Sequence, residues 1–333
     1  MLSKHDITKI QSLAIVIIIV VAIAISAIAI WQTQNWHPNL ATVLVVSTTT
    51  SLYDTGLLDV IEDQFESKYN IDLQFISAGT GLAIQHAQRG DADMILVHAP
   101  SDEIAFMKSG YGVDRKIIAY NFFAIVGPKE DPVGIRDMAP TEALKKLVSS
   151  GRAGKATWVS RGDDSGTHAK EKGLWLAAGF DASKLRDESW YLEAGSGMGK
   201  TLLLTNEKRG YTLADMGTYL KYFADRHIDL EAVVTEGKEL LNVYSAIAVN
   251  SKSNPKANLD NAIIFIKYLA SDEGQKIIGE FGVNKYQRPL FYPSVNLLKT
   301  RSDLKLYSWI EEFAFFEGSE CPQSYRTSGS GLY

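Results

Sequence analysis

The chain has 333 residues, of which 46% are hydrophobic and 22% are charged, a balance that excludes a disordered chain, a collagen and a multi-span membrane protein. Its 34 Lys and Arg against 39 Asp and Glu give a formal charge of −5, which is not the broad basic footprint of a nucleic-acid-binding protein. Cys321 is the only cysteine, so the chain has no internal disulfide and no cysteine-based zinc spacing.

An apolar segment near the N-terminus indicates the compartment. Residues 13–30 are apolar at every position except Ser26, and Lys4 and Lys9 precede them. Such a run can just span a bilayer core of roughly 30 Å, and positive charge before it keeps that end in the cytoplasm. A cleaved signal peptide is the alternative, although its apolar region usually has only about 7–15 residues. We expect residues 1–31 to form a cytoplasmic end and a transmembrane anchor, with the bulk of the chain extracellular or periplasmic.

Strands and helices are expected to alternate after a polar tether at residues 32–41. Apolar or alternating runs at 42–47, 71–75, 94–97 and 122–126 predict strands. Helical spacing predicts one helix after residue 56, and a second runs from the turn at 79–81 to a stop at Gly90. This alternation is typical of a parallel sheet with right-handed crossovers.

A second α/β group follows a shift in composition near Gly127. Its expected elements are a helix at 141–148, a strand at 156–160, a helix at 165–178, a returning strand at 245–249 and a helix pair at 259–281. The segment beyond Pro293 is uneven and ends in a Ser/Gly-rich stretch that we expect to be loose. We therefore predict two lobes, the first from residues 42–126 and 245–333 and the second from residues 127–244.

Three loops rich in Ser, Thr and Gly lie between a strand and a helix, at residues 47–51, 77–81 and 161–168. In an open α/β sheet, ligands bind beyond the carboxyl ends of the strands, where helix starts offer free N–H groups and the positive end of a dipole. Any one such loop is more often a simple N-cap. Together, on both sides of the expected hinge, they predict a cleft for a small anion, with Arg161 as its charged, fork-shaped donor.

Other motifs support an enzyme less well than a binding protein. Residues 194–201 differ from the P-loop pattern at one position, where Ala194 replaces the first glycine. The segment before them is not an apolar strand, and no apolar strand ending in Asp is evident after them. We therefore interpret them as a Gly-rich helix start that could face an anion. Asp163 and Asp164 are interpreted as local caps or partners of Arg161, and His168 as support for the loop. Neither a nucleophile with a base nor a metal cluster is evident, so an outer-face phosphatase is disfavoured.

Several of these motifs resemble the tungstate-binding proteins of ABC importers. The resemblance is carried by Ser-Thr-Thr-Thr-Ser-Leu at 47–52, the turn at 79–81 and Ser-Arg-Gly-Asp-Asp-Ser-Gly-Thr-His at 160–168, and it covers roughly residues 42–293. It implies a two-lobed α/β periplasmic-binding-protein fold of the second type, here preceded by one N-terminal transmembrane helix. It also implies no cofactor and no enzymatic activity, with a membrane permease as partner. The implied ligand-binding residues are Thr49, Thr50, Ser51, Thr80, Arg161, Ser165, Gly166 and Thr167.

The residues of the three loops also bear on the nature of the oxyanion. Phosphate-binding receptors share the pattern Arg-x-x-x-Ser-Gly-Thr, which Arg161 and residues 165–167 match. Phosphate keeps a proton at neutral pH and benefits from a carboxylate acceptor, whereas tungstate and molybdate carry no proton and a carboxylate would repel them. The first two loops contain no Asp or Glu, so we expect a receptor for tungstate or molybdate that serves an ABC importer. A phosphate receptor and an anchored anion sensor are the alternatives.

Overall fold

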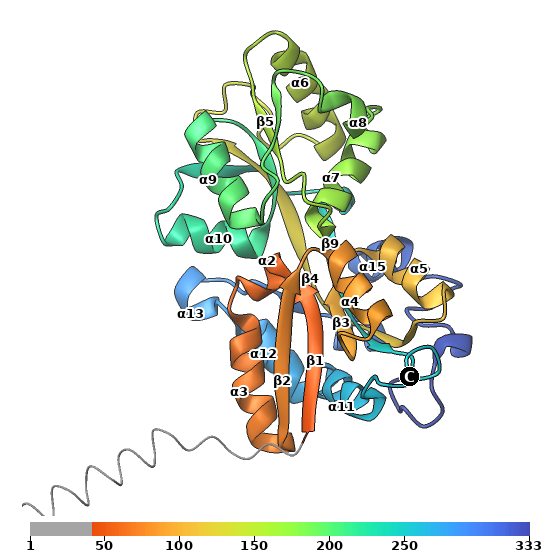
Figure 1. The fold of residues 1–333 in the computed structure, drawn as a ribbon. Helices are drawn as coiled ribbons and strands as arrows, with labels where there is room; N and C mark the ends of the chain where they lie inside the picture. Colours follow the sequence, from red (N-terminus) through yellow and green to blue (C-terminus); the bar gives the residue numbers. More distant parts are fainter. Residues whose placement is uncertain (1–41) are drawn as a thin grey trace, which may run out of the picture. The chain divides into compact units, whose positions relative to one another are not determined.

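A computed structural model describes residues 42–333 (Figure 1). The predicted membrane anchor at residues 1–31 and the tether at 32–41 lie outside the described residues. Between residues 42 and 333, no helix is at once long and apolar enough to cross a membrane.

The first lobe is built on a mixed sheet with the strand order β10-β4-β9-β3-β1-β2. Strand β1 pairs in parallel with β2 and β3, as the alternation predicts, and β9 then runs antiparallel to both β3 and β4. The strands are β1 (Thr42–Thr49), β2 (Ile71–Ala78), β3 (Met94–Val97), β4 (Gly112–Pro128), β9 (Leu241–Val249) and β10 (Tyr292–Pro293). The helices before β9 are α2 (Thr50–Tyr53), α3 (Leu57–Tyr69), α4 (Thr80–Arg89) and α5 (Pro100–Lys108). Those after it are α11 (Leu259–Ala270), α12 (Asp272–Glu280) and α13 (Val283–Tyr286).

The second lobe contains shorter strands covered by helices. Strands β7 (Thr212–Asp215) and β8 (Leu230–Val234) pair with the far end of β4, while β5 (Trp158–Ser160) and β6 (Tyr191–Glu193) form a separate parallel pair. The helices are α6 (Pro140–Arg152), α7 (Gly166–Ala177), α8 (Ala182–Leu185), α9 (Met198–Lys208) and α10 (Met216–Ala224), and η1 (Lys238–Leu240) leads into β9.

Strand β4 is the structural link between the two lobes, and Figure 1 shows it running from one into the other. Its first part pairs with β9 as far as Phe122, and its last part, from Phe123 on, pairs with β7 and β8. Gly127 lies in that last part, where a Cβ atom would be only 2.3 Å from the ring of Tyr211. The glycine therefore permits close packing of the strand against an aromatic ring, and the chain remains extended there.

Each lobe has its own apolar core. In the first lobe, the buried rings of Phe65, Phe265 and Tyr268 pack between α3, α11 and the sheet, with ring centroids 4.8 and 5.3 Å from Phe65. In the second lobe, Trp158 and Trp175 make an edge-to-face contact at 5.0 Å. Separate cores allow the lobes to move as rigid bodies about the strands that join them.

The Ser/Gly-rich end of the chain, which we expected to be loose, lies outside any helix or strand, although Ser330 and Leu332 are buried there. The rest of the segment beyond Pro293 is regular. It forms α14 (Val295–Thr300), α15 (Leu304–Ala314) and η2 (Gln323–Tyr325), and polar contacts hold it on the first lobe. The buried Arg115 guanidinium pairs with Glu103 at 2.7 Å and donates to the carbonyl oxygens of Ala314 and Glu320, both at 2.8 Å. The pattern of apolar residues did not reveal this packing because much of the attachment is polar.

Candidate anion-binding site

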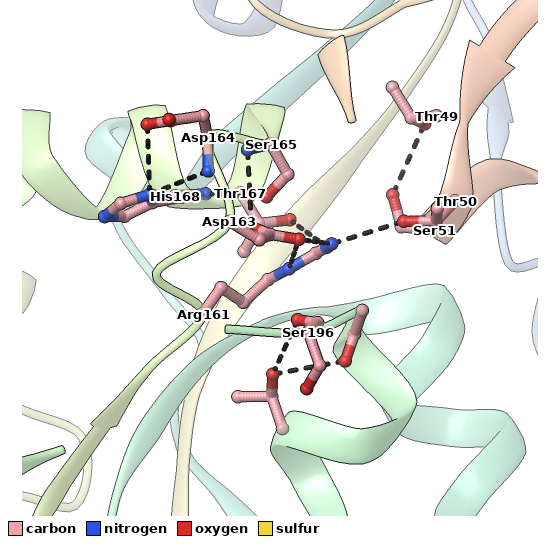
Figure 2. Close-up of polar contacts among 12 residues, drawn as sticks. Thr49, Thr50, Ser51, Arg161, Asp163, Asp164, Ser165, Thr167, His168 and Ser196 are labelled. Carbon is pink, nitrogen blue, oxygen red and sulfur yellow. Dashed lines mark hydrogen bonds and ion pairs between the residues drawn. The ribbon is translucent and has the colours of Figure 1, made fainter. Parts of the chain in front are cut away.

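The first and third of the predicted loops come together where the lobes face each other (Figure 2). In the first loop, Thr49 caps α2 by accepting from the Leu52 N–H at 3.4 Å, and its hydroxyl lies 3.4 Å from that of Ser51. In the third loop, Ser165 caps α7 by accepting from the His168 N–H at 3.2 Å. The interpretation of these residues as caps is therefore correct for both loops, and capping leaves the remaining N–H groups of each first turn available to a ligand.

The second loop closes against the third. A Cβ atom at Gly79 would lie 3.3 Å from the Asp163 carbonyl oxygen, and one at Gly166 would lie 3.0 Å from Thr80 Oγ1. Thr80 is fully buried, and within residues 42–333 its hydroxyl has no hydrogen-bond partner. A buried hydroxyl without a partner is costly, and a ligand that accepts a hydrogen bond from it would remove that cost.

Arg161 connects the two lobes. Its side chain is only 1% exposed, and its Nη2 donates to Thr50 Oγ1 in the first lobe at 3.2 Å. On the second lobe, Nη1 lies 3.5 Å from Thr167 Oγ1, while Nε and Nη2 both donate to the Asp163 carboxylate. The expected pairing with an aspartate is thus present for Asp163, whereas Asp164 points to solvent with 88% of its side chain exposed.

A buried carboxylate fixes the position of the third loop. Glu171, on the second turn of α7, accepts hydrogen bonds from the Trp158 indole N–H at 2.8 Å, the Ser160 hydroxyl at 3.0 Å and the Tyr191 hydroxyl at 2.7 Å. Two of these donors belong to β5, so the start of α7 is held beside the end of that strand. His168 adds support by accepting from the Asp164 N–H at 3.1 Å, as expected of a residue that orders the loop.

A fourth helix start lies beside the site. Gly197 occupies the N-cap position of α9, and a Cβ atom there would be 3.9 Å from Thr50 Oγ1. The interpretation of residues 194–201 as a Gly-rich helix start is therefore correct. The expectation that no strand ending in Asp follows these residues is wrong, because the buried strand β7 ends in Asp215. This carboxylate caps α10 by accepting from the Thr218 N–H at 2.8 Å.

Sequence reasoning assigned no role to His98, which the structure places at the site. The ring follows β3 and is 4% exposed, with Nε2 3.3 Å from Ser51 Oγ and Nδ1 2.9 Å from Asn242 Oδ1. Burial, with the fields of Arg161 and Lys170, lowers the pKa of His98 from 6.5 to about 4, although its bond to Asn242 acts in the other direction. The imidazole is therefore neutral at pH 7. Its position after a buried strand was the one signal available in the sequence.

The arrangement suits a small anion. It provides several helix starts, neutral hydroxyls from both lobes and one buried guanidinium, all of which are hydrogen-bond donors. Among residues 42–333, no group of three or more His, Cys, Asp or Glu side chains is placed to hold a metal ion. Two α/β lobes joined by long strands, with such a group of donors where they meet, define the periplasmic-binding-protein class of solute receptors.

Comparison with known proteins agrees with this class. Residues 33–273 match the family model described as the PBP superfamily domain. The chain is 39% identical over 254 residues to the tungstate-binding protein TupA of Peptoclostridium acidaminophilum, an alignment that covers 75% of this chain and 85% of that protein.

Two solved structures are similarly related. The tungstate-binding protein TupA of Desulfovibrio alaskensis G20 is 41% identical with a TM-score of 0.65, and the match covers 76% of this chain and 99% of that one. The tungstate ABC transporter structure from Geobacter sulfurreducens is 45% identical with a TM-score of 0.63, covering 71% and 97%. The chain thus belongs to the PBP superfamily and, within it, to the family of tungstate-binding proteins of ABC importers. The resemblance seen in the motifs is confirmed, and these relatives are named for binding and transport and not as enzymes.

Proposed function

We propose that this chain is an extracytoplasmic receptor that captures tungstate, with molybdate as its close analogue, and delivers it to the permease of an ABC importer. The observation that carries the proposal is the site itself. A buried guanidinium, a buried hydroxyl that has no partner among residues 42–333, and helix starts from both lobes converge there, in a chain that is 39% identical to a tungstate-binding protein.

The proposed ligand residues divide between the lobes. The first lobe supplies the hydroxyls of Thr49, Thr50, Ser51 and Thr80. The second lobe supplies Arg161, the hydroxyls of Ser165 and Thr167, and the N–H groups at the start of α7, including that of Gly166. A tetrahedral dianion held from both sides favours the arrangement in which the lobes are closed.

The donor set favours an oxyanion without a proton. Asp163 is the carboxylate nearest to the proposed donors, and both of its oxygens are already occupied, Oδ2 by Arg161 and Oδ1 by the Ser165 N–H at 3.3 Å. A hydrogen phosphate ion would need an acceptor for its own proton, and this carboxylate has little capacity left. Tungstate makes no such demand, which supports it over the phosphate alternative.

The proposal also includes attachment and movement. Residues 1–31 remain on the chain as a single-pass anchor, joined by the tether at 32–41 to two lobes, 42–126 with 245–333 and 127–244. The support for the anchor is the run of apolar residues 13–30 with lysines before it. No further signalling domain is needed for a receptor that presents its closed form to a permease.

Equilibrium dialysis of the purified full chain tests the function directly. With EDTA present and no nucleotide added, the protein should retain tungstate and molybdate at a stoichiometry of one. Tighter retention of phosphate than of tungstate would contradict the proposal, and so would binding that requires added zinc or magnesium.

A further inference from the structure

A chain of hydrogen bonds runs from the first lobe to the anion site through three buried side chains. Asn121 Nδ2 donates to the Leu290 carbonyl oxygen at 3.3 Å, and Asn242 Nδ2 donates to Asn121 Oδ1 at 2.9 Å. His98 Nδ1 then meets Asn242 Oδ1 at 2.9 Å, and His98 Nε2 meets Ser51 Oγ at 3.3 Å. Asn121 lies on β4 and Asn242 on β9, so this series of hydrogen bonds begins on two neighbouring strands, one of which, β4, links the lobes.

The Leu290 carbonyl at one end determines which atom is donor and which is acceptor in each of these hydrogen bonds. A backbone carbonyl can only accept, so Asn121 must present its amide nitrogen to Leu290 and its oxygen to Asn242. Asn242 then presents its nitrogen to Asn121 and its oxygen to His98. The proton of the neutral imidazole is therefore on Nδ1, and Nε2 carries a lone pair.

This tautomer conflicts with the role proposed for Ser51. A serine hydroxyl has one proton, and the lone pair of His98 Nε2 takes it, so Ser51 presents only lone pairs to the cleft. An oxyanion needs donors there. A proton on Nε2 resolves the conflict, because the imidazolium donates to Asn242 and to Ser51 at once and frees the Ser51 hydroxyl to donate to the ligand.

We infer that His98 is a positioning residue that takes up one proton from solvent when the oxyanion binds. The receptor with a neutral His98, the dianion and one proton combine into a complex in which His98 is an imidazolium. The proton comes from a buffer acid, whose bond to that proton is the only covalent bond broken. The inference deepens the proposed function and rests on it. It also favours unprotonated oxyanions, since a site composed of donors cannot accept the proton of hydrogen phosphate.

Several charged groups surround His98, and they set the direction of the effect. Burial is the main cause of its low pKa of about 4, and Arg161 and the α7 residue Lys170 also oppose its protonation. Glu239 lines the cavity that His98 also lines, Glu103 on α5 is paired with Arg115, and Asp215 is buried at the start of α10. A bound dianion offsets the two cations, so the pKa of His98 rises on binding.

Proton linkage gives the sign of the pH dependence. Between the pKa of the free protein and the higher pKa of the complex, affinity falls tenfold for each unit of rising pH if one proton is taken up. Burial lowers the pKa of Lys170 to about 8, so Lys170 also titrates at higher pH. The measurement therefore belongs at pH 6.5–7.5, with a readout on the histidine itself.

The test combines calorimetry with NMR of the full chain labelled at histidine. Tungstate is titrated at pH 6.5 and 7.5, each in two buffers of different ionisation enthalpy, and the Nε2 resonance of His98 is assigned by its loss in His98→Gln. We expect net uptake approaching one proton, a protonated Nε2 in the complex, and an affinity for tungstate that falls several-fold between pH 6.5 and 7.5. His98→Gln should abolish the uptake and weaken binding at pH 6.5 at least tenfold, while His227→Gln, which changes a histidine beyond α10, should retain both.

The outcomes separate this inference from the proposed function. Tight tungstate binding without proton uptake, and with Nε2 still unprotonated, overturns the role of His98 and leaves the receptor function intact. Failure to bind tungstate, together with binding of phosphate against an unprotonated Nε2, overturns both. Equal loss of proton uptake in His98→Gln and His227→Gln also overturns the inference, because the uptake would then not belong to His98.

Discussion

Replacing Arg161 with alanine should be the most damaging single change to oxyanion binding. The guanidinium is 1% exposed, and its Nε and one Nη2 hydrogen are directed at Asp163. The fork expected to face the ligand is thus shared with a carboxylate. The remaining Nη2 hydrogen is directed at Thr50 and one Nη1 hydrogen at Thr167, so an anion between these two residues takes the second Nη1 hydrogen and replaces the weak contacts to the hydroxyls. Each bond to a charged partner contributes about 1.5–3 kcal/mol.

The magnitude follows from the loss of these bonds together with the charge that remains. Arg161→Ala removes one or two such bonds and leaves Asp163, with 16% of its side chain exposed, as an unpaired negative charge beside a dianion. We expect a loss of at least about 3 kcal/mol, which is more than about a hundredfold in affinity. Arg161→Lys should recover only part of it, because an ammonium cannot satisfy Asp163, Thr50 and the ligand with one planar group.

Titration calorimetry with tungstate measures these losses, and thermal unfolding checks that each variant is folded. Arg152→Ala is the matched control, since Arg152 is also paired with a carboxylate, Glu188, but is 54% exposed and outside the site. The reasoning is refuted if folded Arg161→Ala loses less than tenfold, or if Ser165→Ala costs as much.

Three further predictions concern closure, attachment and pH. Gly79→Val should weaken tungstate binding about tenfold in calorimetry, because a Cβ atom there lies 3.3 Å from the Asp163 carbonyl oxygen. Gly81→Ala should not weaken it, because a Cβ atom at Gly81 lies 3.8 Å from the Asp164 carbonyl oxygen. Equal effects would argue against tight closure. Mass spectrometry of the native protein should find residues 1–31 attached, and a chain beginning near Trp31 would indicate cleavage instead. The free energy of unfolding should fall as pH drops from about 6.5 to 4, because His98 binds a proton in the unfolded chain and resists it in the folded one. The fall in the free energy of unfolding that is due to His98 reaches about 3 kcal/mol. His98→Gln should remove that part of the pH dependence.

The amino-acid pattern predicted the parts of the fold that depend on local, apolar periodicity. The strands at 42–47, 71–75 and 94–97 and the helices that follow the first two carry clear patterns, and each loop of the site lies directly after a strand. Strand β4 was predicted only at its end, since its first half is buried on both faces and contains Asp114, Arg115 and Lys116, which interrupt any apolar run. The packing of the C-terminal segment depends on these buried polar groups and was missed for the same reason.

The candidate site was predictable where a motif contains the residue, and unpredictable where only folding brings it there. Arg161 and Ser165 lie within one recognisable loop. His98 and Asn242 are 144 positions apart, and their contact exists only because β3 and β9 are neighbours in the sheet. A single sequence contains no signal for such a pair.

A competitive calorimetric titration of the full chain with tungstate, molybdate, sulfate and phosphate, in EDTA and at pH 7, tests the central claim most directly. The proposed receptor should bind tungstate and molybdate at one site per chain, each at least a hundredfold more tightly than phosphate. Preference for phosphate, or failure of tungstate to bind at any attainable concentration, would contradict it.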